Sequence, residues 1–214
     1  GIILDKKDEI TTIALFFEFL EFNLYDCMKF LNNTLKTKIV IEIVHAMNYI
    51  HKHGMIHRNL TIDNIRLNKG FEAKIIGFNL IKIYEFIPEI MVYPDETMTK
   101  KVGSLGYMSP KMLNEEEYDY KTDVYSFGVV LNMIFVGSLP MKIDGEKVKL
   151  PNPSSSISQC CIDIISNCLM HEPSKRPSFE EILQKIRENS YSLASDVDNK
   201  IVSQRDQELQ HFGE

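Results

Sequence analysis

The sequence predicts an α+β fold in which a few strands come first and helices form most of the rest. Residues 10–20 are rich in β-branched and aromatic side chains, which indicates a buried strand, and Ile2–Leu4 is its expected partner across the charged residues 5–9. From Leu35 onward, apolar residues recur at helical spacing until Gly54, a typical helix-stop residue. The 214 residues, 44% of them hydrophobic, suit one globular domain with a sizeable core.

The second half of the sequence carries three further helix signals. The almost wholly apolar segment Val124–Val136, followed by Gly137, predicts a helix that is buried on all sides. An apolar stripe at helical spacing runs through Ile157–Leu169. Ser178–Glu181 (SFEE) is a capping box, which predicts the start of a last helix.

Less regular structure is expected in the middle of the chain and at its C-terminus. Two short strands, Ile65–Leu67 and Ala73–Ile76, precede an irregular stretch, residues 77–111, whose length is typical of functional or disordered loops. After Asn189 the sequence becomes polar, which predicts a loosely ordered tail. We therefore expect one domain over residues 1–188 and a polar tail over residues 189–214.

Charge and composition argue against several classes of function. The net charge of −6 is spread along the chain, and no basic block indicates a nucleic acid or an anionic membrane as partner. The longest apolar run, Phe127–Val136, is too short to span a bilayer, and no signal peptide is expected. The four cysteines lack disulfide-scaffold spacing, so we expect a reducing, cytoplasmic setting. Cys160, Cys161 and Cys168 lie on or beside an apolar stripe, so we expect them to pack in the core. His51 and His53 are too close to share a helix face, so no metal site is expected.

Five motifs occur in an order that points to one family. Ile56–Ile65 (IHRNLTIDNI) has the form of a catalytic loop HRDLxxxN, and Gly77-Phe78-Asn79 follows where DFG would stand. The other three are Gly103–Lys111 (GSLGYMSPK), Lys121–Gly128 (KTDVYSFG) and the late pair Arg176-Pro177. With these motifs the chain resembles the large lobe of a protein kinase, mostly α-helical, with a remnant of the small-lobe sheet before it. The wording VYSFGVVL and RPSFEEIL is most similar to the tyrosine-kinase-like branch.

The resemblance implies a degenerate catalytic loop. His57 and Arg58 match the family's pattern. The catalytic aspartate, which accepts or orients the proton of the substrate hydroxyl, corresponds to Asn59, an amide that cannot act as a general base. The loop lysine that contacts the transferred phosphate corresponds to Thr61.

The metal and nucleotide positions are degenerate in the same comparison. Of the family's two metal ligands only Asn64 is retained, because the DFG aspartate corresponds to Gly77. One neutral oxygen is a poor Mg²⁺ site, so no metal or cofactor is expected. The family also places an aliphatic residue under the adenine ring, and the corresponding residue here is the long, charged Arg66.

The N-terminal part of the resemblance is short. No Gly-rich loop, strand lysine or glutamate-bearing helix precedes Ile10, so the chain is expected to begin near the fourth strand of the small lobe. Phe17, Glu18 and Phe19 would then correspond to the gatekeeper and hinge. Whether the natural protein carries the rest of the small lobe is left open.

The scaffold residues of the family are better retained than its chemical ones. His57 and Phe78 match its packing spine, and Asp123 matches the residue that braces the catalytic loop from the central helix. One departure is Lys111, which stands where the family has a glutamate paired with the late arginine, here Arg176. Lys111 and Arg176 are therefore expected to face each other as like charges.

Four hydroxyl side chains lie where kinases are phosphorylated for activation. The family's loop arginine, here Arg58, can pair with such a phosphate. An ordinary polar loop is the alternative interpretation. The candidate phosphosites are Tyr93, Thr97, Thr99 and Ser104.

Three hypotheses for function follow. The first is a pseudokinase-type binding or regulatory module that acts with a protein partner or an upstream small lobe. The second is a weak or atypical Ser/Thr or Tyr kinase that uses Mg-ATP and whose small lobe lies outside this chain. The third is a degenerate fragment without function, which poor folding of the chain would favour.

Overall fold

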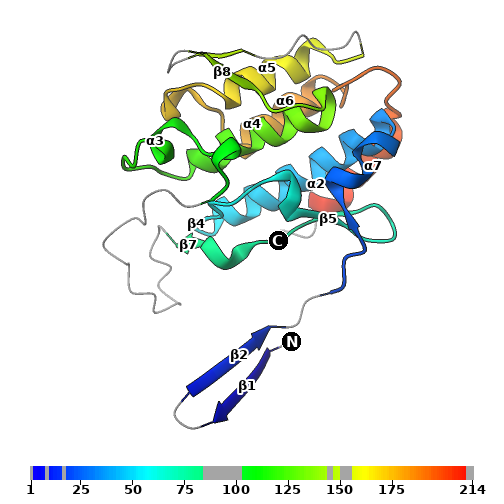
Figure 1. Ribbon diagram of the computed structural model, residues 1–214. Coiled ribbons are helices and arrows are strands. Elements are labelled where there is room, and N and C mark those ends of the chain that lie inside the picture. The colour runs from blue at the N-terminus through cyan, green and yellow to red at the C-terminus, as the bar shows by residue number, and fades with distance from the viewer. Residues whose placement is uncertain are drawn as a thin grey trace.

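The computed structural model describes residues 2–7, 10–15, 18–83, 103–143, 147–149 and 156–210 of the chain (Figure 1). Side chains are described for residues 18–83, 103–140 and 156–210. Within these ranges strands are short and come mainly first, while helices make up most of the body. The predicted α+β fold class is confirmed.

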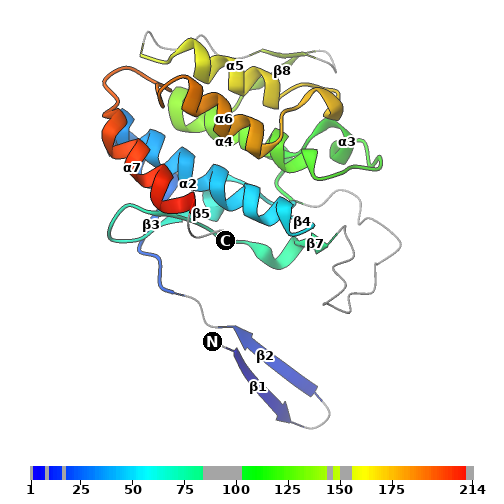
Figure 2. The same cartoon turned by 180° about the vertical axis from the view of Figure 1, so that it is seen from behind.

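The N-terminal strands form an antiparallel hairpin. β1 (Ile2–Lys7) pairs with β2 (Ile10–Leu15), so that Ile2 lies opposite Leu15. The expected pairing is confirmed, but β1 continues through the charged residues to Lys7, because ladder hydrogen bonds involve only the backbone. The predicted strand over residues 10–20 is too long, since residues 18–20 are not in a strand. Figures 1 and 2 show the hairpin standing apart from the helical body.

A small antiparallel sheet lies against the first long helix. Its strand order is β3-β5-β6, with β3 at Phe22–Asn23, β5 at Ile65–Leu67 and β6 at Ala73–Ile75. Both predicted short strands are thus confirmed. Ile65 and Leu67 are fully buried, so this face of β5 belongs to the core. Two further pairs are β4 (Met55–Ile56) with β7 (Lys82–Ile83), and β8 (Met141–Ile143) with β9 (Lys147–Lys149).

The first long helix, α2 (Asn33–Lys52), begins and ends as the sequence predicts. The side chain of Asn32 accepts a hydrogen bond from the Leu35 amide at 2.9 Å and caps the helix. At the other end Gly54 has φ 66°, the left-handed conformation that glycine adopts without strain. The apolar face of α2 is buried in the core.

The second long helix, α4 (Lys121–Val136), is buried nearly throughout, as predicted. It ends at Gly137, which has φ 81°. Gly128 allows the helix α5 (Gln159–Cys168) to approach closely, because a Cβ placed there would lie 2.7 Å from the Cβ of Cys168. No helix among the described residues is long and apolar enough to cross a membrane.

Two shorter helices complete the core: α5 packs against α4, and α6 (Phe179–Glu188) packs against α2. α5 is capped by Ser158, and α6 begins with the predicted capping box. Burial raises the pKa of Cys161, and it raises the pKa of Cys168 to about 12, so both thiols are protonated packing groups. The remaining short elements are α1 (Leu24–Cys27), α3 (Pro110–Leu113) and 3₁₀ turns at Met28–Phe30, Ile62–Asn64, Phe78–Leu80, Leu105–Tyr107 and Pro173–Lys175.

The prediction of a loosely ordered tail is wrong for the described part of the C-terminal segment. α7 (Asn199–Gln210) packs alongside α2, with Val202 and Asp206 buried (Figures 1 and 2). Asp206 accepts hydrogen bonds from His45 at 2.7 Å, from Arg187 at 2.8 and 2.9 Å, and from Tyr191 at 2.7 Å. A polar sequence therefore docks here because its charges find partners. The division of the chain at residue 188 stays a prediction.

Candidate functional site

The candidate site is the loop that follows β4. Its backbone is hydrogen-bonded to one buried carboxylate, that of Asp123. Asp123, in the first turn of α4, has no exposed surface. It accepts hydrogen bonds from the backbone amides of His57 and Arg58, each at 2.8 Å, and lies 2.9 Å from Nε2 of His51. The charge is thus compensated by three donors, which is what a buried carboxylate requires.

Arg58 takes a strained backbone conformation at this point. Its φ of 64° lies in the left-handed region, which is uncommon for a residue other than glycine. Its amide is held by Asp123, while its guanidinium donates to the carbonyl of Leu80 at 2.5 Å and to the hydroxyl of Tyr118 at 3.3 Å. These contacts fix the loop against the segment after β6.

The imidazole of His57 is a buried packing group with a defined tautomer. Burial lowers the pKa of His57, so the ring is neutral near pH 7. Nε2 donates to the carbonyl of Ile76 at 3.1 Å, and Nδ1 therefore accepts from the amide of Asn59 at 3.3 Å. The ring of Phe78 meets the imidazole edge-on at 5.0 Å.

The groups that Asn59, Asn64 and Gly77 bring to the outer face of the loop are neutral. Nδ2 of Asn64 donates to the carbonyl of Asn59 at 2.8 Å, so the Asn64 side chain lies across the loop. Gly77 has φ 85°, and a Cβ placed on it would lie 2.8 Å from both Cγ and Nδ2 of Asn64. The space that a side chain at residue 77 would need is therefore taken by Asn64.

The side chain of Thr61 points into the protein and caps a turn of this loop. Its side chain is almost fully buried and its hydroxyl accepts from the amide of Asn64 at 3.2 Å, which caps the 3₁₀ turn Ile62–Asn64. A capping hydroxyl is committed to the backbone, so it is not directed at a ligand outside the loop.

The donor set of this site does not fit a divalent metal. Within the described ranges no group of three or more His, Cys, Asp or Glu side chains lies close enough to hold a metal ion. Asn64 offers one amide oxygen, and Gly77 offers no side chain. Mg²⁺ in nucleotide sites is usually bound through carboxylates, so we derive no chemical step through this ion.

Comparison with known proteins places this arrangement in a family. The model of the protein kinase domain matches residues 3–186, which is most of the chain. The chain belongs to the protein kinase domain family. Its large-lobe architecture, with the catalytic-loop segment resting on α4, is that of a kinase-like domain.

Individual relatives are named as protein kinases, and two of the following three are named as serine/threonine-protein kinases. A "Probable serine/threonine-protein kinase" of Dictyostelium discoideum is 34% identical over 168 residues, which is 74% of this chain and 17% of that protein. The human "SNF-related serine/threonine-protein kinase" is 32% identical over 71% of this chain and 20% of its own length. "Protein kinase kin1" of Schizosaccharomyces pombe is 32% identical over 68% and 16%. The chain thus spans a fifth or less of the length of these relatives.

The expected nucleotide-contacting residues of this kinase domain lie on the sheet and before it. Arg66 stands on β5 opposite Lys74 of β6 and Asn23 of β3, and it is half-buried on the face away from the buried Ile65 and Leu67. Its direction is therefore away from the helical core. Glu18 and Phe19 are exposed, Phe19 by 83%, and Phe17 lies outside the described residues.

The expected meeting of Lys111 with Arg176 is not what the described contacts show. Arg176 is 2% exposed and donates to the carbonyls of Met170, His171 and Lys121 at 2.8, 2.9 and 3.0 Å, beneath the ring of Tyr125. Among the described residues no contact joins it to Lys111. Burial lowers the pKa of Arg176 to about 10, and three carbonyl dipoles take the place of the glutamate with which the family pairs this arginine.

Two residues at the loop, Asp63 and Tyr107, were not among the site residues predicted from the sequence. Asp63 is exposed and lies near Tyr107, whose pKa is raised to about 12 by burial, with the Asp63 charge adding to the effect. Asp63 stands inside the loop motif, so its position was a usable signal. Tyr107 gave none, because its proximity depends on tertiary packing.

The candidate phosphosites fall mainly outside the described residues, where Tyr93, Thr97 and Thr99 lie. Ser104 is described and exposed, just before the 3₁₀ turn Leu105–Tyr107. Next to it, Gly103 has φ 103°, and a Cβ on it would lie 2.7 Å from the carbonyl oxygen of Arg58. This segment therefore passes directly over the loop.

Proposed function

We propose that this chain is a pseudokinase-type binding or regulatory module of the protein kinase superfamily, without phosphotransfer activity. The observation that carries the proposal is the pair Asn59 and Gly77: an amide at the catalytic position and no side chain beside Asn64. Phosphoryl transfer depends mostly on positioning and charge neutralisation, so losing both carboxylates removes the base and most of the metal clamp. A general base alone typically contributes about 10²–10⁴ in rate.

The geometry around residue 77 strengthens this proposal. A carboxylate restored there would need Asn64 to move, because the new Cβ would lie 2.8 Å from its Cγ. Asn64 is held by its 2.8 Å hydrogen bond to the Asn59 carbonyl. The surroundings have thus adapted to glycine, and one back-substitution does not rebuild the clamp.

Protein contacts are the expected mode of action. Phe19 is 83% exposed and Phe30 is 79% exposed, and exposed aromatic side chains are enriched where proteins bind partners. A protein partner or a small lobe supplied from outside residues 1–214 would cover such surface. We also propose a cytoplasmic setting and membership of the tyrosine-kinase-like branch, on the cysteine pattern and on the VYSFGVVL wording.

The second candidate function is a weak or atypical Ser/Thr protein kinase that uses Mg-ATP and a small lobe outside this chain. The printed names of the relatives favour it over the first, since they are serine/threonine kinases. The residues at positions 59 and 77 favour the first. Retained bracing by Asp123 is compatible with both, so an activity measurement has to decide.

The deciding experiment measures transfer of radiolabelled phosphate from Mg-ATP or Mn-ATP to a general protein substrate and to the chain itself. We expect no incorporation above that of a heat-unfolded control. Asn59→Asp should also be inactive, because the second carboxylate is still missing.

Asn64→Ala is the matched control for contamination. Incorporation that persists in Asn64→Ala comes from a contaminating kinase and leaves the proposal standing. Incorporation that disappears in Asn64→Ala would establish the second candidate function instead.

A further inference from the structure

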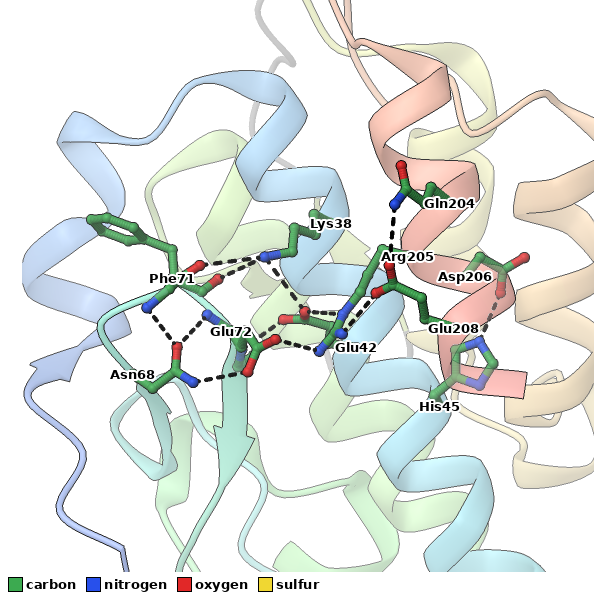
Figure 3. Close-up of polar contacts among 12 residues, drawn as sticks. Lys38, Glu42, His45, Asn68, Phe71, Glu72, Gln204, Arg205, Asp206 and Glu208 are labelled. Atoms are coloured by element: carbon green, nitrogen blue, oxygen red, sulfur yellow. Dashed lines mark hydrogen bonds and ion pairs between the residues drawn. The ribbon is translucent and has the colours of Figure 1, made fainter. Parts of the chain in front are cut away.

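One arginine of α7 connects three elements of the body (Figure 3). Nε of Arg205 donates to Oε1 of Glu42 on α2 at 2.7 Å, and Nη2 lies 3.1 Å from Oε1 of Glu72, just before β6. The Glu42 side chain is only 2% exposed, so this pair meets largely out of solvent. Oε2 of Glu42 accepts from the amide of Ala73 at 2.6 Å, which extends the contact into the backbone of β6.

The turn between β5 and β6 is organised by the same carboxylates. Oδ1 of Asn68 accepts from the amides of Gly70 at 2.9 Å and Glu72 at 3.0 Å. Nδ2 of Asn68 donates to Oε2 of Glu72 at 2.8 Å (Figure 3). One carboxylate oxygen of Glu72 therefore accepts a hydrogen bond from the turn, and the other pairs with Arg205. Glu72 thus links α7 to the turn.

The turn stores backbone strain at its tip. Phe71 has φ 54°, which is uncommon for a bulky residue and persists only where neighbours hold it. Nζ of Lys38 lies 3.5 Å from the carbonyls of Gly70 and Phe71, and 3.7 Å from Oε1 of Glu42 (Figure 3). The strained residue is thus fixed by the same network that receives Arg205.

The tip of the turn also contacts the start of β3, at the N-terminal side of the helical body. The ring of Phe71 stacks on that of Phe22, with centroids 5.8 Å apart and an interplanar angle of 4°. Phe22 begins β3 and directly follows residues 18–21, which we call the connecting segment because they lead from the hairpin to the body. Lys69 of the turn also lies 3.2 Å from Glu21 of this segment.

We propose that α7 acts as a strut that sets the position of the connecting segment through the β5–β6 turn. Arg205 holds Glu72 and Glu42, and these hold the turn and keep Phe71 in its strained conformation. Phe71 then holds Phe22 by ring stacking, to which the exposed pair of Lys69 with Glu21 adds little. A partner that displaces α7 would free the connecting segment while the loop braced by Asp123 stays in place. The coupling does not depend on whether the chain transfers phosphate.

Hydrogen exchange of the full chain, followed by mass spectrometry, tests the strut. In Arg205→Met the amides of residues 70–73 and of residues 18–23 should exchange about tenfold faster, because these segments open locally. Residues 55–64 and α4 should stay within about twofold of the unmodified chain. Gln207→Ala is the matched control, since Gln207 is an exposed residue of the same helix, and it should change neither segment.

Two gentler variants keep the test decisive if Arg205→Met fails to fold. Arg205→Lys keeps the charge but loses the fork that spans two carboxylates, and Glu72→Gln removes the ion pair of Glu72 with Arg205 together with its longer, 3.8 Å pair with Lys74. Both should raise exchange in residues 70–73 and 18–23, and the effect of Glu72→Gln should vanish in the Arg205→Lys background. Unchanged exchange in both segments, or an equal rise over the whole chain, would overturn the proposal.

Discussion

The two faces of the candidate loop differ in kind. On the inner face, the buried carboxylate of Asp123 receives both loop amides, and the neutral ring of His57 is fixed between Ile76 and Asn59. On the outer face stand Asn59 and Gly77, neither of which offers a charge. The difference teaches that the residues that shape this loop and the residues that would do chemistry on it are separate sets, and that one set can be kept without the other.

The largest expected effect is on the inner face. Asp123→Ala should lower the free energy of unfolding by about 4 kcal/mol, because the amides of His57 and Arg58 lose their acceptor and the contact of the carboxylate with His51 is lost. Urea denaturation measures this change. The matched control is Asp63→Ala, which removes an exposed carboxylate from the same loop and should change stability by less than about 0.5 kcal/mol. Equal effects of the two variants would break the distinction between the faces.

A second buried carboxylate extends the comparison to α7. Burial alone would raise the pKa of Asp206, but hydrogen bonds from His45, Arg187 and Tyr191 hold that pKa well below its usual range. Because the pKa is lower in the folded state, the stabilisation is complete above the ordinary value of about 4 and is lost as the pH falls below it.

Asp206→Asn should therefore cost about 2 kcal/mol near pH 7 and progressively less below pH 4, because Asp206 in the unfolded unmodified chain then binds a proton while the folded carboxylate does not. Denaturation curves of the two proteins over a pH series measure the difference. A difference that stays constant down to pH 2 would show that the charge of Asp206 contributes nothing.

The smallest expected effect concerns Lys111. Since Arg176 donates to three carbonyls, Lys111→Glu should change the free energy of unfolding by no more than about 0.5 kcal/mol. Arg176→Ala should cost about 3 kcal/mol, because three partly buried carbonyls lose their donor and the almost fully buried side chain leaves a void beneath Tyr125. A stabilisation of about 1 kcal/mol by Lys111→Glu that disappears in the Arg176→Ala background would restore the like-charge contact expected from the sequence.

Local periodicity accounts for what the sequence predicted well. α2, α4 and α6 follow from apolar spacing, a capping box and glycine stops, all of which act within one or two turns of helix. The loop motif likewise locates His57 and Asn64, because the spacing between the two residues is a property of the sequence itself.

What the sequence did not predict depends on contacts between distant residues. α7 has a weak apolar stripe and docks through Arg205 and Asp206, whose partners lie far away in the chain. Arg176 was expected beside a charged side chain, but its partners are backbone carbonyls, which are the same for every sequence. Thr61 was compared with a lysine by position, while its capping role follows from the local 3₁₀ turn.

The most direct test of the central contrast is whether the outer face holds a metal-bound nucleotide. The melting temperature is measured with low-millimolar ATP, with Mg²⁺ and with EDTA, and a relative that keeps both aspartates serves as the positive control. A ligand at 100 times its Kd stabilises a fold by about 2.7 kcal/mol, which a melting curve resolves. We predict the same melting temperature in both conditions, because Asn59, Asn64 and Gly77 supply no carboxylate. A clear Mg²⁺-dependent rise in the melting temperature that is abolished by Asn64→Ala would contradict the account.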